Sequence, residues 1–175
     1  MIKTTIYSLA LSTIALSSGA IATSVTNLTF TPKPSQVLSN TVYIAASSVN
    51  TASLEVLVFN QINDYRASQG LPRLTRNSAI DNQARIHSQD MASGKVPFGH
   101  TGFPERVSAI GIPYSAAGEN VASNGGYSNP AKIAVQGWLN SPGHLANIRG
   151  NYNKTGIGVS SKDGREIYFT QIFLR

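Results

Sequence analysis

The side chains best suited to chemistry in this sequence are its three histidines, because the chain contains no cysteine. A neutral imidazole can move protons near neutral pH and can bind a metal ion. Cysteine nucleophiles, disulfides, iron–sulfur clusters and thiolate zinc sites are excluded by composition. Any bound metal would therefore have to be held by histidine and carboxylate side chains.

Two histidines and one glutamate stand out from their surroundings. His100 lies between a glycine and a threonine in an expected loop, and His144 lies in the first turn of an expected short helix. Glu119 sits in an otherwise small and apolar segment, where a carboxylate needs a hydrogen bond or a cation. These three side chains could hold a zinc ion whose fourth position is filled by water. His87, by contrast, falls on the apolar stripe of a helix, which favours a packed core histidine.

The spacing of these residues leaves other chemistry open. Glu119 comes 19 residues after His100 and 25 residues before His144, which matches no local metal-binding motif. A serine–histidine–aspartate triad is a second possibility because serine is abundant, but the Gly-x-Ser-x-Gly elbow of such hydrolases does not occur. No phosphate-binding glycine loop occurs either.

Periodic patterns predict the elements that must position these groups. Helices are expected over residues 53–69, 78–93, 104–110, 130–139 and 142–148. Alternating residues over 154–160 and 165–174, joined by an Asp163-Gly164 turn, predict a strand hairpin at the end of the chain. Helices first and strands last indicate layers of the α+β type rather than a parallel βαβ sheet.

The first 22 residues have the features of a secretory signal peptide. A positive start at Lys3 precedes an apolar run over residues 6–16, and Ala20-Ile21-Ala22 provides a small-x-small cleavage signal. No cysteine follows this signal, so lipoprotein anchoring is not expected. We expect a protein that is secreted to the cell exterior or the periplasm, is cleaved near Ala22 and keeps no transmembrane anchor.

Residues 23–52 have the composition of a flexible linker, and residues 53–175 that of one globular domain. The linker segment is rich in Ser, Thr, Asn and Pro and contains Lys33 as its one charged residue. The whole chain carries 14 Lys and Arg against 8 Asp and Glu, a net charge of +6 that mildly favours anionic partners. The basic residues are scattered and no nucleic-acid-binding motif occurs, so a nucleic acid is not an expected partner.

A series of short motifs runs through residues 55–175. They are Ile62–Arg66 with Gly70–Leu74, His87–Met91, Gly99–Thr101, Gly118–Ala122, Trp138–His144, Gly156–Val159 and Tyr168–Gln171. In this order they resemble the CAP superfamily, the SCP-like family of cysteine-rich secretory, venom-antigen and pathogenesis-related proteins. Each motif is weak alone, whereas the ordered set is specific. The Ser-Pro-Gly-His sequence at 141–144 and the lack of cysteine point to the bacterial secreted branch.

The resemblance implies a fold and a site. The fold would be α+β, a three-layer α-β-α sandwich with a central antiparallel sheet. The family cleft carries a His–Glu–Glu–His tetrad that holds a divalent ion in some members, and His100 and Glu119 match its first two positions. Ser141 stands at the second glutamate position, and the strand of the second histidine reads Tyr168-Phe169-Thr170-Gln171. With His144 as the replacement ligand, the predicted metal set is His100, Glu119 and His144, with zinc or another divalent cation as an optional occupant.

Two functions remain open at this point, and the sequence does not decide whether the chain is an enzyme. The leading hypothesis is a cleft-based binding module for a lipid, a wall component or a protein partner, because half of the tetrad is absent and no nucleophile–base pair is evident. The alternative is a zinc-assisted, protease-like hydrolase in which a zinc-bound water attacks a peptide or ester. We expect the three candidate side chains to converge on one cleft and Trp138 to be buried beneath it.

Overall fold

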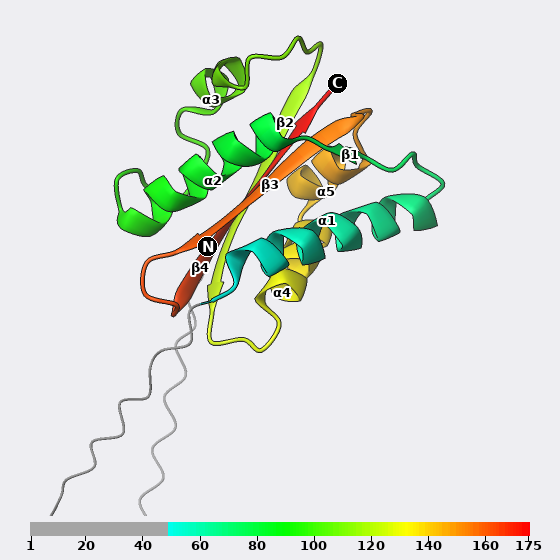
Figure 1. Cartoon of the computed structure of the whole chain (residues 1–175). Helices are drawn as coiled ribbons and strands as arrows, with labels where there is room; N and C mark the ends of the chain where they lie inside the picture. Colours follow the sequence, from blue (N-terminus) through cyan, green and yellow to red (C-terminus); the bar gives the residue numbers. More distant parts are fainter. Residues whose placement is uncertain (1–48) are drawn as a thin grey trace, which may run out of the picture. The chain divides into compact units, whose positions relative to one another are not determined.

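The computed structural model describes residues 49–175 (Figure 1). The predicted signal peptide, residues 1–22, lies outside the described residues, as does the predicted linker except for residues 49–52. The first helix, α1 (Thr51–Ser68), starts two residues before the predicted domain boundary at Ser53. Within residues 49–175, no helix is long and apolar enough to span a bilayer.

The elements follow in the order that the sequence patterns predict, with two additions. After α1 the chain forms β1 (Thr75–Arg76), α2 (Ser78–Ser93), α3 (Phe103–Ala109), β2 (Ala117–Gly125), α4 (Pro130–Leu139), α5 (Pro142–Arg149), β3 (Lys154–Ser161) and β4 (Glu166–Leu174). The predicted helices and the final hairpin are confirmed. The additions are β1 and β2: β1 is too short to show a pattern, and β2 is continuously buried over residues 118–121, so it lacks polar–apolar alternation there.

The sheet has the strand order β1-β3-β4-β2. β4 runs antiparallel to both of its neighbours, whereas β1 adds a two-residue parallel pairing to β3. The expected antiparallel sheet is therefore confirmed, with β1 as a parallel addition at one edge. β2 forms the opposite edge of the sheet.

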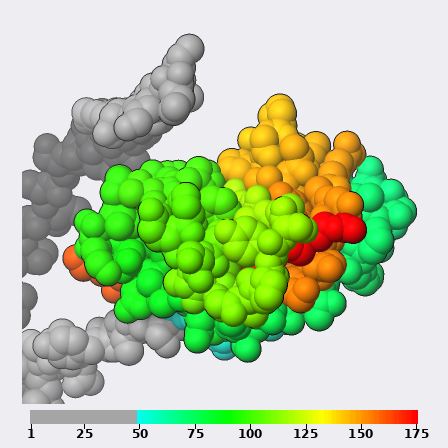
Figure 2. Space-filling view, turned by 90° about the horizontal axis from the view of Figure 1, so that it is seen from above, coloured from blue at the N-terminus to red at the C-terminus, as the bar shows by residue number. Residues whose placement is uncertain are grey.

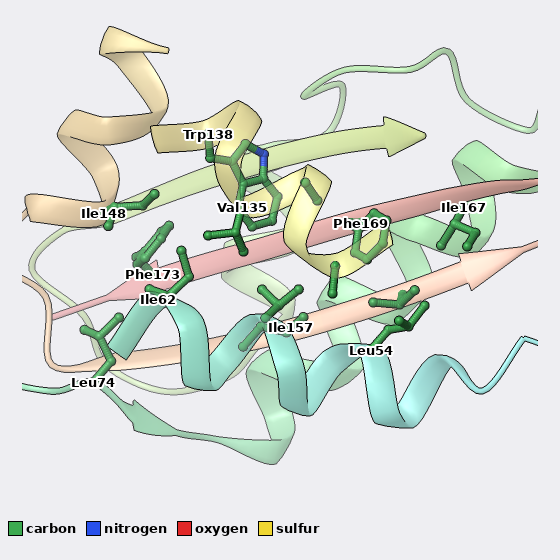
Figure 3. Close-up of a cluster of buried hydrophobic side chains, with 14 residues drawn as sticks. Leu54, Ile62, Leu74, Val135, Trp138, Ile148, Ile157, Ile167, Phe169 and Phe173 are labelled. Carbon is green, nitrogen blue, oxygen red and sulfur yellow. The ribbon is translucent and has the colours of Figure 1, made fainter. Parts of the chain in front are cut away.

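Helices cover both faces of this sheet. α2 and α3 lie on one face, and α1, α4 and α5 lie on the other (Figure 1). Alternate β4 side chains separate two cores: Phe169 and Phe173 pack with α1 and α4 (Figure 3), whereas Ile172 and Leu174 pack with α2 and α3. From above, the green α2–α3 layer lies beside the red carboxyl end of β4 (Figure 2). This arrangement is the three-layer α-β-α sandwich of the α+β class that the resemblance implied.

A buried arginine ties the first helix to the last one. The Arg66 guanidinium of α1 is 1% exposed and donates to the carbonyl oxygens of Pro72 (2.9 Å), Ile148 (2.7 Å) and Gly150 (3.0 Å). Ile148 and Gly150 lie at the C-terminal end of α5, where carbonyl groups lack intrahelical donors. Arg66 therefore completes this end of α5 and fixes α5 against α1, which in turn positions His144 in the first turn of α5.

Two glycines of β3 allow α2 to lie directly on the sheet. Gly156 and Gly158 face α2, and a Cβ atom at either position would overlap the α2 backbone. The hydroxyl of Ser88, on α2, donates to the Gly158 carbonyl at 2.9 Å across this contact. Because α2 leads into the loop that carries His100, the close contact also determines how near that loop comes to β2.

Gly158→Ala should lower the free energy of unfolding by about 1–3 kcal/mol, because the added methyl group must push α2 away from the sheet. Gly137→Ala is the matched control, since Gly137 is exposed on α4 and a Cβ there meets no atom within 4 Å. The control should be neutral or stabilising by up to about 1 kcal/mol through helix propensity. Urea denaturation checks both variants, and equal unfolding free energies for the two would contradict the tight α2–β3 contact.

Candidate functional site

The candidate site is built on β2, the edge strand. In the β2–β4 pairing, Glu119 lies opposite Ile172, whose side chain belongs to the core under α2 and α3. Residues opposite each other in antiparallel strands share a face, so the Glu119 side chain points toward the α2–α3 layer. Asn120 points to the other face, where its side-chain amide donates to the His144 carbonyl at 3.2 Å. β2 thus contacts both helical layers through adjacent residues.

Glu119 is neutralised by a buried arginine of α3. Arg106 Nε donates to Glu119 Oε2 and Arg106 Nη2 to Oε1, each at 2.9 Å, so the pair is bidentate. The two side chains are 8% and 1% exposed. Arg106 Nη1 also donates to the Thr101 carbonyl at 3.0 Å, which ties the preceding loop to the same pair. The predicted need of Glu119 for a cation is confirmed, but Arg106 was not among the predicted site residues; its signal was that it is the one basic residue between His100 and Glu119.

His100 makes the third contact of this carboxylate. Its Nδ1 lies 2.9 Å from Glu119 Oε1, and a carboxylate can only accept, so the neutral ring carries its proton on Nδ1 and leaves Nε2 as an acceptor. The His100 side chain is 50% exposed, and its ring therefore remains accessible from solvent. His87 supports this loop from below: it is buried, as predicted, and its Nε2 donates to the Gly99 carbonyl at 2.8 Å.

His144 approaches from the opposite helical layer. Its ring centroid lies 6.5 Å from that of His100, with the two rings tilted by 45°. Burial, and to a smaller extent the neighbouring His100, lowers the pKa of His144 and favours its neutral form. The structure therefore brings the three predicted residues to one place: His100 and Glu119 in direct contact, and His144 beside His100.

The donor set of this place does not form a ready metal site. Both oxygens of Glu119 accept from Arg106, and Oε1 also contacts His100. Within residues 49–175, no three histidine, aspartate or glutamate side chains are grouped so that they could hold a metal ion. A divalent cation would have to displace a guanidinium that is already hydrogen-bonded in a bidentate pair. Metal binding by His100, Glu119 and His144 stays a prediction.

A groove of about 390 Å³ begins beside His144 and follows the outer edge of β2. Its lining consists of Phe98, Val121, Ala122, Ser123, Asn124, Ile133, Ala134, Gly137, Trp138, Ser141 and His144. His144 is the one titratable side chain among them. Phe98 forms the wall on the α2–α3 side, where its ring lies 6.4 Å from that of Tyr168, the residue in the strand of the second family histidine. The volume falls in the range of sites for small ligands.

Trp138 forms the inner wall of the groove. It is 1% exposed, which confirms its predicted burial, and its indole Nε1 donates to the Val121 carbonyl at 2.9 Å. A buried indole N–H needs such a partner. Because Trp138 is the single tryptophan of the chain, its fluorescence reports on this groove.

Arg106→Met should lower the free energy of unfolding by about 3–5 kcal/mol, since it leaves a buried carboxylate without its cation. The double variant Arg106→Met, Glu119→Gln should recover much of this loss, because it removes both charges and keeps the shape. Urea denaturation at pH 7 compares the two proteins. A single variant as stable as the double variant would show that Glu119 does not depend on Arg106.

The stability of the domain should fall as the pH decreases below about 6.5, the ordinary histidine value. Burial lowers the pKa of His87 more than its hydrogen bond to Gly99 raises it, so the folded state resists protonation that the unfolded chain accepts. The unfolded state therefore binds more protons in this range, and acid favours unfolding. Denaturation at pH 7.5 and pH 5.5 measures the loss, which His87→Gln should reduce. An unchanged loss in that variant would rule out His87 as its source.

Comparison with known proteins agrees with this geometry. The model of the family described as "Cysteine-rich secretory protein family" (CAP) matches residues 59–173. An uncharacterized Bacillus subtilis protein, YkwD, is 38% identical over 141 residues, which cover 78% of this chain and 52% of that protein. The chain thus spans about half the length of this relative.

Two solved structures are similar in fold. An extracellular protein containing an SCP domain from Bacillus anthracis has a TM-score of 0.60 and 28% identity, over 71% of this chain and 41% of that one. An outer surface protein of Borrelia burgdorferi also gives 0.60, over 70% of this chain and 92% of that one, and at 18% identity it shows the fold alone. The chain belongs to the CAP family of cysteine-rich secretory proteins, although it contains no cysteine.

Proposed function

We propose that this chain is a binding module that acts outside the cytoplasm and holds a ligand or partner in the β2 groove without chemical turnover. The observation that carries the proposal is that Glu119 is already neutralised by Arg106, next to a groove without charged side chains. The predicted signal peptide and the extracellular Bacillus anthracis relative support the location. A lipid, a wall component and a protein segment are the classes of ligand to be tested.

The hydrogen bonds of the site support binding rather than hydrolysis. The ring nitrogens of His87 and His100 contact the Gly99 carbonyl and the Glu119 carboxylate, and within residues 49–175 neither contacts a serine or threonine hydroxyl. A nucleophilic mechanism needs such a hydroxyl–base pair. Glu119 is also a poor general base here, because the guanidinium holds the carboxylate in its charged, hydrogen-bonded form.

A zinc-assisted hydrolase is the second candidate, and the proximity of the two imidazoles favours it. His100 and His144 lie with ring centroids 6.5 Å apart, at the open end of the groove. This function requires Arg106 to release Glu119 so that His100, Glu119 and His144 can hold the metal. When bound, the ion would activate a water molecule. The two candidates therefore differ in their response to a chelator.

Ligand binding should change the fluorescence of Trp138, because this side chain lines the groove. The protein is titrated in turn with anionic phospholipid vesicles, soluble wall-polymer fragments and a pool of random octapeptides, each with and without EDTA. Gly137→Leu is the blocking variant: nothing lies within 4 Å of a Cβ there, so the new side chain fills the groove without a backbone clash. We expect a saturable signal with one probe, unaffected by EDTA and lost in Gly137→Leu.

Two results would argue against this function. A signal that is equal in Gly137→Leu and the unchanged protein would place the ligand elsewhere. Stoichiometric zinc together with EDTA-sensitive cleavage of a probe would favour the hydrolase instead. Gly137→Ala is the matched control, because it adds only a methyl group at the same position and should keep the signal.

A further inference from the structure

The outer edge of β2 carries main-chain groups that the sheet does not use. Among the described strands, β2 pairs with β4 alone. Alternate residues of a strand direct their N–H and C=O groups to the same edge. The carbonyls of Glu119 and Val121 accept from Asn147 (3.0 Å) and Trp138 (2.9 Å), whose side chains come from α5 and α4. These contacts identify the odd-numbered residues of β2 as the set that faces away from β4.

Ser123 is the next residue of this outward set. Within residues 49–175, no hydrogen bond from α4, α5 or the loops reaches its N–H or C=O group. Ser123 lines the groove together with Ala122 and Asn124, which belong to the opposite face of β2. Because residues of both faces line it, the groove follows the strand edge itself. Its floor at Ser123 is therefore a main-chain donor and a main-chain acceptor.

We propose that the ligand of this groove is an extended peptide segment that pairs through its main chain with β2 at Ser123. The proposal rests on the proposed function, that the groove binds a ligand. An added strand presents alternating N–H and C=O groups to the edge and sends successive side chains to opposite sides. Here one side is the Phe98 wall and the other is the α4 wall around Ile133 and Gly137.

The charge of the groove selects this class of ligand. None of its lining residues carries a formal charge while His144 is neutral, although the whole chain has a net charge of +6. An anionic polymer would find no cation in the groove, and a lipid chain would leave the main-chain groups at Ser123 without partners. A peptide main chain is uncharged and supplies both a donor and an acceptor at this spacing.

Side chains of the two helices limit the length of the pairing. Trp138 and Asn147 already occupy the outward carbonyls of Val121 and Glu119, so the edge is closed toward His144 and open at Ser123. Covered edges also protect a sheet from unspecific strand addition. The groove is therefore suited to a short segment of a partner rather than to an additional long strand.

A selected peptide tests the pairing directly. Octapeptides are selected from a random library displayed on phage against the full chain, and the strongest binder is synthesised and measured by Trp138 fluorescence. Ser123→Pro removes the N–H from the edge, and proline is tolerated on edge strands whose N–H faces solvent. Ser123→Ala keeps the N–H and is the matched control. We expect about a tenfold loss of affinity for Ser123→Pro, equivalent to about one hydrogen bond, and about none for Ser123→Ala.

A second arm uses the peptide instead of the protein. Methylation of main-chain nitrogens at one alternate set of peptide positions should reduce binding to the unchanged protein, whereas methylation of the other set should have little effect. This arm decides the matter if Ser123→Pro fails to melt cooperatively. Equal binding of both methylated sets would overturn the main-chain pairing.

The outcomes separate this inference from the proposed function. If Gly137→Leu abolishes binding while Ser123→Pro and both methylated peptides bind normally, the groove binds its ligand by side chains and the pairing is wrong. If selection yields no peptide that Gly137→Leu excludes, while vesicles or wall fragments still give a groove-dependent signal, the peptide class is wrong and the proposed function stands. If no probe depends on the groove, both fail.

Discussion

A carboxylate buried at the edge of a sheet is the constraint around which this site is organised. Glu119 would be costly there without a cation, and Arg106 supplies one in a bidentate pair with both side chains nearly inaccessible. The same guanidinium reaches the Thr101 carbonyl, and the same carboxylate accepts from His100. One pair thus attaches α3 and the preceding loop to β2, and it also determines the tautomer of the exposed histidine.

The scaffold that brings these groups together depends on close backbone contacts. Glycines at 156 and 158 let α2 rest on β3, and Arg66 joins α1 to the end of α5. The first contact fixes the layer that carries His100, and the second fixes the helix that carries His144. The edge strand β2 lies between the two layers, so both histidines meet beside it. The groove along its outer edge is a consequence of the same arrangement.

This arrangement gives the family cleft a particular character in this chain. The cation beside Glu119 belongs to the protein itself, and Ser141 replaces the second family glutamate at the groove wall. Tyr168, in the strand of the second family histidine, packs near Phe98 rather than facing a ligand as an imidazole would. The polar groups left to a ligand are mainly those of the β2 main chain and the His100 ring. They suit recognition of a neutral, hydrogen-bonding partner.

The sequence by itself determined the helices, the final hairpin and the family, because periodic apolar residues, glycine stops and the Asp163-Gly164 turn act over a few neighbouring residues. It also indicated that Glu119 needs a cation and that His100 and His144 lie near it. Only the tertiary structure decided that the cation is Arg106, that the 118–121 segment is an edge strand and that a groove runs along it. These features depend on which layers cover each face of the sheet, and pairing between distant segments leaves no period in the local sequence.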